Sequence, residues 1–153
     1  MRQQPTAAML APVELIARFI AGGDDGCLRA FAARDVVILE NFAPHLFTGA
    51  SAVTQWAKQM RKHTKALSGL KHAFGAAQDV RVAAQHAYFA LPTQWIGVAN
   101  GRLFHEDGGW AFLLVKQRGA WRVRSYSWAV TQFSFDQELR AGRPAVLRAK
   151  VLD

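Results

Sequence analysis

The order of hydrophobic patterns along the chain is the feature that most limits its fold. Apolar residues recur at helical spacing in the first half, whereas the second half holds long β-type runs separated by short turn signals. Asn100-Gly101 and Arg118-Gly119 are two such signals, and Asn-Gly is a strong tight-turn dipeptide. Helices followed by an antiparallel meander predict an α+β domain with helices packed on one face of a sheet. A chain of 153 residues fits one such domain.

Three helices are predicted ahead of the strand-rich half, each from apolar residues at helical spacing. Glycine pairs and side chains that can cap a helix mark their ends. The expected helices run from Pro12 to Gly22, from Asp24 to about Arg34, and from Ser51 through Met60. Residues 1–11 are expected to form a loose leader, and residues 132–153 a basic C-terminal tail, on either side of a domain spanning 12–131.

The predicted strands are rich in β-branched and aromatic residues. They cover 36–39, 70–74 with 80–83 as one broken strand, 86–98, 109–116 and 121–130. Pro92 lies inside the longest of them and predicts an edge position or a bulge there, because proline has no N–H for a strand ladder. The segment 41–49 is expected to be a loop.

Three stretches carry a resemblance to a known group of proteins. They are VELIARFIAGGDDGCLRAFAARDVVILEN, GASAVTQWAKQM and GGWAFLLVKQRGAWRVRSYSWA. Their order resembles the nuclear transport factor 2-like superfamily, which includes SnoaL-like and ketosteroid isomerase-like proteins and scytalone dehydratase. The resemblance implies three N-terminal helices on a strongly curved, mostly antiparallel sheet, a cystatin-like cone roll. It also implies an apolar pocket inside the cone, and in many members a homodimer formed through the outer face of the sheet.

Glu40 is the first candidate for catalysis. It ends an apolar strand, and in the resemblance it falls where the isomerase keeps its general-base aspartate. A carboxylate at the rim of an apolar pocket can act as a proton shuttle near neutral pH, because burial disfavours its charged form. The alternative is a strand-end glutamate that faces solvent or pairs with an arginine. Ile16 and Trp110 stand where the isomerase has its oxyanion-stabilising tyrosine and aspartic acid, which argues against isomerase activity.

His86 is the second candidate for catalysis. If it faced the pocket together with His72, the two could serve as acid and base in an elimination like that of scytalone dehydratase. The alternative is a histidine that is only hydrogen-bonded at a strand edge. His105 is expected in a solvated turn with its acidic neighbours. No histidine pair has metal-ligand spacing and no glycine motif could cradle a phosphate, so neither a metal nor another cofactor is expected.

Aromatic residues of the last strands are expected to bind a ligand. Alternation places them on shared strand faces, and converging rings would suit a flat apolar molecule anchored by the Tyr126 hydroxyl. The predicted ligand-binding residues are Trp110, Phe112, Tyr126, Trp128, Tyr88 and Trp56. The alternative is ordinary core packing of the same rings.

Charge and composition limit the partners. Nineteen Lys and Arg against eleven Asp and Glu give a formal net charge of +8, but no groove-binding motif accompanies it, so a nucleic-acid partner is not expected. No signal-peptide pattern and no apolar run of membrane-spanning length is found, which predicts a cytoplasmic protein. The expected function is binding of a small apolar or aromatic molecule, with cofactor-free isomerase, cyclase or dehydratase chemistry if it is an enzyme. The alternative is a non-catalytic dimeric module that docks a protein through its outer sheet face and basic tail.

Overall fold

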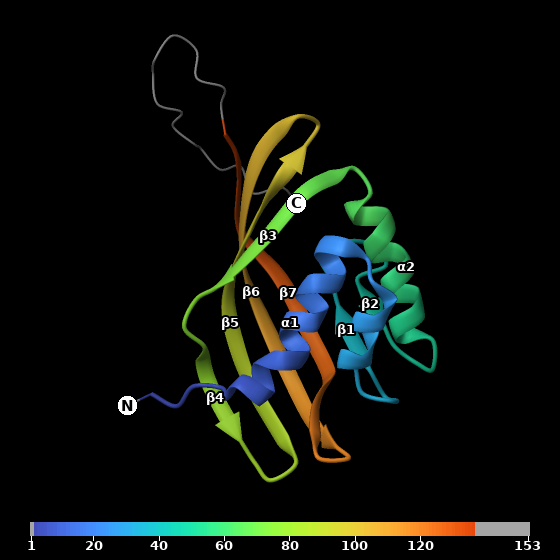
Figure 1. Cartoon of the computed structure of the whole chain (residues 1–153), viewed down its shortest axis with the longest axis vertical. Coiled ribbons are helices and arrows are strands. Elements are labelled where there is room, and N and C mark those ends of the chain that lie inside the picture. The colour runs from blue at the N-terminus through green and yellow to red at the C-terminus, as the bar shows by residue number, and fades with distance from the viewer. Residues whose placement is uncertain (1, 137–153) are drawn as a thin grey trace.

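The computed structural model describes residues 2–136 as helices packed against one sheet (Figure 1). The elements in chain order are α1 (Ala7–Gly22), the 3-10 helix η1 (Asp25–Ala30), β1 (Val37–Leu39), β2 (Leu46–Phe47), α2 (Ala52–Thr64), β3 (Leu67–Phe74), β4 (Gln78–Val82), β5 (His86–Ala99), β6 (Arg102–Gln117) and β7 (Ala120–Phe135). The predicted fold class is confirmed as α+β, with three helices on a mostly antiparallel sheet. Within the described residues, no helix is long and apolar enough to cross a bilayer.

The seven strands form one sheet in the order β2-β1-β7-β6-β5-β3, and β4 also pairs with β5. The pairing of β1 with β7 is parallel, whereas the neighbouring pairs are antiparallel. Both β3 and β4 lie along β5, which confirms the prediction of one broken strand. In Figure 1, α1 crosses the long strands, and α2 lies beside β1 and β2.

Pro92 lies where β5 changes partner. Thr93 pairs with β3 and Ala90 pairs with β4, so Pro92 falls in the gap between the two shorter strands. Its carbonyl accepts a hydrogen bond of 2.7 Å from the Gly75 N–H. Because the N–H and C=O of one residue in an antiparallel strand point to the same side, the missing proline N–H also faces this gap. The strand therefore loses no ladder bond at the proline.

Strand register decides which side chains face the helices. Phe89, Phe112, Tyr126 and Ile38 are aligned across β5, β6, β7 and β1, and all four are fully buried. Since alternate residues of a strand point to opposite faces, the row next to them faces away from the helices. Tyr88, which is aligned with Leu113 in that row, is 39% exposed.

The first helix differs from its predicted start. It begins at Ala7 rather than Pro12, because Thr6 caps it by accepting a 3.3 Å hydrogen bond from the Met9 N–H. Residues 7–11 of the expected leader are therefore helical. Pro12 lies inside the helix, where its lost N–H costs one backbone hydrogen bond.

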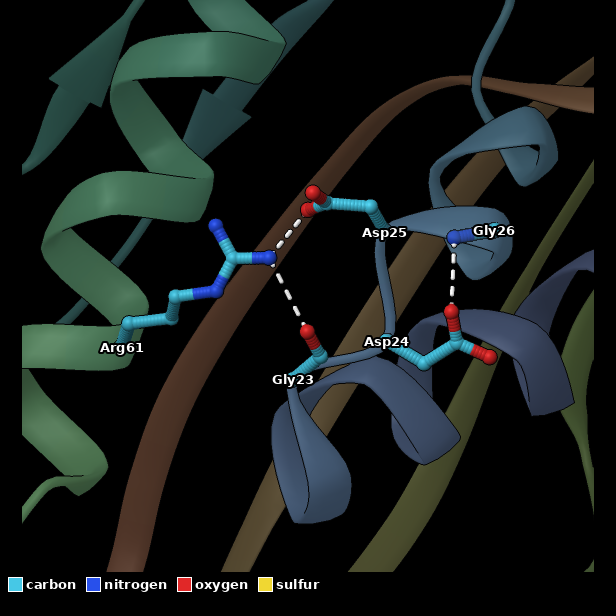
Figure 2. Close-up of polar contacts among 5 residues, drawn as sticks. All are labelled: Gly23, Asp24, Asp25, Gly26 and Arg61. Atoms are coloured by element: carbon cyan, nitrogen blue, oxygen red, sulfur yellow. Dashed lines mark hydrogen bonds and ion pairs between the residues drawn. The ribbon is translucent and has the colours of Figure 1, made fainter.

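The second helix is shorter than predicted. Asp24 caps η1 as expected, and its carboxylate accepts a 2.8 Å hydrogen bond from the Gly26 N–H (Figure 2). The helix ends at Ala30 and not near Arg34, because the following residues join the sheet. The Ala32 N–H donates to the carbonyl of Val123 in β7 over 2.9 Å.

Arg61 of α2 fastens the loop between α1 and η1 (Figure 2). Its guanidinium donates to the Gly23 carbonyl over 2.9 Å, pairs with the Asp25 carboxylate, and lies 5.0 Å from the centre of the Phe19 ring. The Arg61 and Asp25 side chains are 44% and 75% exposed, so the ion pair by itself adds little stability. The contacts with the Gly23 carbonyl and the buried Phe19 ring hold α2 against the end of α1.

The last two long strands extend beyond their predicted ends. The strand β6 begins at Arg102, seven residues before the predicted start at Gly109, and β7 continues to Phe135 instead of ending at Val130. His105 is thus paired within the sheet, and the prediction of a solvated turn is wrong. The predicted loop 41–49 contains the short strand β2. Residues 132–135 of the predicted tail belong to β7, and residues 137–153 lie outside the described part of the chain.

Candidate functional site

A cavity lies between the helices and the sheet. Its volume is about 60 Å³, or about 520 Å³ when the empty space that opens to solvent at its mouth is counted. Most of its lining is apolar, with two carboxyl groups and one imidazole. The lining residues are Ile20, Glu40, Asn41, Phe42, Met60, His63, Thr64, Leu67, Leu70, Trp95, Phe104, Glu106, Trp110 and Trp128. Asn41 and His63 are exposed, so the cavity opens to solvent beside them.

Glu40 lies in this cavity directly after β1 and is 7% exposed. Its Oε1 atom accepts a 3.0 Å hydrogen bond from the Trp56 indole N–H and a second from the Tyr126 hydroxyl. Burial raises the pKa of Glu40 to about 7, although these donors and the Asn41 backbone partly offset the increase. The alternative of a solvent-facing or arginine-paired glutamate is therefore wrong. At this pKa the group can accept or release a proton near neutral pH.

Glu106 is a cavity residue that sequence reasoning missed. It lies in β6, aligned with Trp95 in β5 and Phe133 in β7. Burial raises its pKa, and the Trp128 indole partly offsets the increase. Period-two alternation counted backwards from Trp110 would have found it, because residues 108, 106 and 104 share the face of Trp110. The polar and glycine-rich composition of 105–109 instead suggested a turn.

The structure brings together most of the predicted aromatic residues. Trp110 and Trp128 line the cavity, with ring centres 5.9 Å apart in an edge-on arrangement. Trp56 and Tyr126 are buried behind it and hold Glu40, and Phe112 is buried against Tyr126. Tyr88 is not part of this group, because it lies on the opposite face of the sheet.

The two candidate histidines are not brought together. His86 is exposed and aligned with Val115. It lies two residues before Tyr88 on β5, so it shares the face of Tyr88 and points away from the helices. His72 is aligned with Trp95 on the helix-facing side, and its Nε2 lies 2.9 Å from the Glu14 carboxylate. The condition for an acid–base pair, that both histidines face one cavity, is therefore not met.

His63 is the histidine that lines the cavity, and sequence reasoning missed it. Its ring stacks on Phe42 with 4.5 Å between the ring centres, and partial burial lowers its pKa. No apolar alternation marks it, because it projects from the last turn of α2. Across residues 2–136, no three His, Cys, Asp or Glu side chains are grouped so that they could hold a metal ion.

Trp110 carries a polar atom that the rest of the described chain leaves unpaired. Its Nε1 is buried and has no hydrogen-bond partner there, and such a donor costs about 1–3 kcal/mol. Ile16, the other residue at an isomerase donor position, is fully buried and supplies no donor. At the second position the Trp110 indole N–H is a donor, and it is fully buried with no acceptor among the described residues.

Comparison with known proteins shows the fold. No family model matches the chain, and no curated protein matches its sequence. A type 2 hexachlorocyclohexane dehydrochlorinase, LinA, aligns with a TM-score of 0.73 and 10% identity over 92% of this chain and 94% of its own. A ketosteroid isomerase-like protein from Erwinia carotovora atroseptica aligns with a TM-score of 0.62 and 17% identity over 82% of this chain and 92% of its own. A scytalone dehydratase-like protein from Novosphingobium aromaticivorans aligns with a TM-score of 0.64 and 16% identity over 90% of each chain. The chain has the nuclear transport factor 2-like fold, which confirms the resemblance, and a shared fold leaves the activity open.

Proposed function

We propose that the chain binds a small, largely apolar or aromatic molecule in the cavity and that Glu40 moves a proton to or from it. The observation that carries this proposal is a buried carboxyl group with a pKa of about 7 in an aromatic-lined cavity. Perturbed carboxyl groups in clefts are candidates for acid–base chemistry. We propose that this chemistry needs no cofactor, that the protein does not bind nucleic acid, and that it acts in the cytoplasm.

The hydrogen bonds of Glu40 suggest how the proton moves. Both side-chain donors bind Oε1, so the second carboxylate oxygen, Oε2, takes a proton from a carbon of the ligand. The electron pair of that C–H bond shifts toward a ligand oxygen, which gains negative charge. Return of the proton to another carbon gives an isomerisation, and departure of a leaving group with its electron pair gives an elimination. A cyclisation results when the carbanion attacks a carbonyl carbon of the same molecule, and the carbonyl oxygen then takes the electron pair and the proton from Glu40.

Replacing Glu40 with glutamine tests this step. We expect the wild-type protein to accelerate uptake of deuterium at the α-carbons of 2-indanone, an aromatic ketone, in D₂O near neutral pH. The E40Q variant should lose this acceleration by about 100-fold or more, because glutamine cannot accept the proton. Nuclear magnetic resonance of 2-indanone measures the rate. Glu14→Gln, which changes an exposed carboxylate, serves as the control, and an unchanged rate in E40Q would remove Glu40 from the mechanism.

A second candidate function rests on the outer face of the sheet. Leu39, Tyr88 and Leu103 are each about two-fifths exposed, and their register places them on the face opposite the helices. Tyr88 lies beside Leu113 on this face, whereas Leu103 lies ten residues along β6 from Leu113. Adjoining apolar residues on an exposed face can form a contact surface. We propose that this face joins two copies of the chain in a homodimer. A non-catalytic module that docks another protein is the alternative that the same patch favours.

The mass in solution tests the dimer. We expect sedimentation equilibrium to give twice the chain mass of 16.9 kDa. Tyr88→Glu should yield monomers, because it buries a charge in the contact, whereas Tyr88→Phe should remain dimeric. A monomeric wild-type protein at micromolar concentration would contradict the dimer proposal. The alternative, a module that docks another protein through this face, would then be favoured.

A further inference from the structure

The cavity holds acidic side chains and no lysine or arginine, although the chain as a whole is basic. The formal net charge is +8, yet the lining residues include two glutamates and neither lysine nor arginine. In the described part of the chain, neither Glu40 nor Glu106 forms an ion pair with a basic side chain. Buried carboxyl groups are ordinarily paired with a cation or hydrogen-bonded. Glu40 has its two side-chain donors, whereas no cationic side chain accompanies either group.

Aromatic rings surround Glu106 in particular. Trp95 is aligned with it on β5, and Phe104 lies two residues before it on the same face of β6. Both rings are at least nine-tenths buried and line the cavity. Trp128 of β7 lies near enough to the Glu106 carboxyl group to favour its charged form. With Trp110 and Phe42 included, three indoles and two phenyl rings thus share one cavity with this carboxyl group.

We propose that the ligand carries a positively charged nitrogen, either a protonated amine or a quaternary ammonium, which binds beside Glu106 among the rings of Trp95, Trp110 and Trp128. This inference rests on the proposed function, because it names the chemical class of the molecule in the same cavity. The carboxylate supplies the countercharge, and the electron-rich ring faces attract the cation. An anionic ligand would find no lining lysine or arginine to neutralise it.

A cation in this place also explains how Glu40 becomes a base. Burial is the main cause of the raised pKa of Glu40, and charge repulsion from Glu106 adds a smaller increase. A cation beside Glu106 reverses that contribution, because an opposite charge favours ionised carboxyl groups nearby. Binding of the cation therefore prepares Glu40 to accept a proton from the rest of the ligand.

Two probes of the same shape test the inference. Choline and 3,3-dimethylbutan-1-ol differ in that a quaternary nitrogen replaces a quaternary carbon. Titration followed by ¹H–¹⁵N nuclear magnetic resonance reports the indole N–H signals of the tryptophans. We expect choline to bind at least about tenfold more tightly than the alcohol and to shift the signals of Trp95, Trp110 and Trp128. The Trp121 signal, from outside the cavity, should not move.

Matched variants assign the effect to Glu106. Glu106→Gln should remove the preference for choline and leave the affinity for the alcohol unchanged. Asp107→Asn is the control, because Asp107 is the adjacent carboxylate on the same strand and bonds to Gln94 on the other side of the sheet. If E106Q does not fold, Trp128→Leu should lower choline affinity instead. Equal binding of both probes, or retention of the preference in E106Q, would overturn the inference.

The outcome is separable from that of the proposed function. If choline shows no preference while 2-indanone still exchanges deuterium through Glu40, the cation site is wrong and the proton-transfer proposal stands. If choline binds beside Glu106 and 2-indanone exchange is absent, the proton-transfer proposal is wrong and the cation site stands.

Discussion

Replacing Glu40 with glutamine is expected to remove most of the pH dependence of stability between pH 4.5 and 8. The folded protein raises the pKa of this group from 4.5 to about 7, so at intermediate pH the folded state holds a proton that the unfolded state has released. The free energy of unfolding of the wild-type protein should therefore fall as pH rises from 4.5 through 7 and then level off. Over this pH range the free energy of unfolding should fall by about 3 kcal/mol. Glutamine does not titrate, so it contributes nothing to the pH dependence of stability.

Urea unfolding of both proteins at pH 5 and pH 8 measures this difference. E40Q should retain only a small pH dependence, because the raised pKa of Glu106 and the lowered pKa of His63 change the stability in opposite directions as pH rises. Asp79→Asn, at an exposed position whose partner is Arg81, should keep the full wild-type slope. A loss of stability in E40Q as large as that of the wild type would show that Glu40 is ionised in the folded protein at pH 5.

Replacing Gly108 with alanine is expected to destabilise the protein and to displace Trp128 from the cavity. A Cβ atom at Gly108 would lie 2.4 Å from Cη2 of Trp128 and 2.5 Å from the carbonyl oxygen of Ala129. Both contacts are closer than atoms tolerate, and the second is to backbone, which yields little. Overpacking of this kind costs about 3 kcal/mol, which lowers the Tm of a domain this size by about 10 °C.

The adjacent glycine gives a matched control for this change. A Cβ atom at Gly109 would meet nothing within 4 Å, so Gly109→Ala should leave the Tm within about 1 °C. Thermal unfolding measures both variants, and the indole signal of Trp128 reports its displacement in G108A alone. Equal Tm values for the two variants would show that Trp128 moves aside at no cost.

Much of the fold could be predicted because local signals and the tertiary structure agree. The Asn100-Gly101 and Arg118-Gly119 turns join the long strands as expected. Both residues of each turn have a positive φ. Pro92 marks the gap between β3 and β4. Glu40 could be found because it follows an apolar strand. These features depend on neighbours in sequence, which is where pattern reasoning is strongest.

The rest of the site depends on pairing between distant strands. Glu106 was hidden because glycine and acidic residues resemble a turn, although the flanking strands hold residues 102–108 in the sheet. His86 and Tyr88 were placed in the site because alternation fixes which residues share a face but not which face the helices cover. His63 could not be found from strand patterns, since its helix reaches the cavity only in the folded chain.

The two donors to Glu40 come from different layers of the molecule. Trp56 belongs to α2, and Tyr126 belongs to β7 at the centre of the sheet. Loss of the Glu40 proton converts both contacts into charge-assisted hydrogen bonds, which are shorter and stronger. A molecule that ionises this carboxyl group therefore changes the hydrogen bonds that join α2 to the sheet.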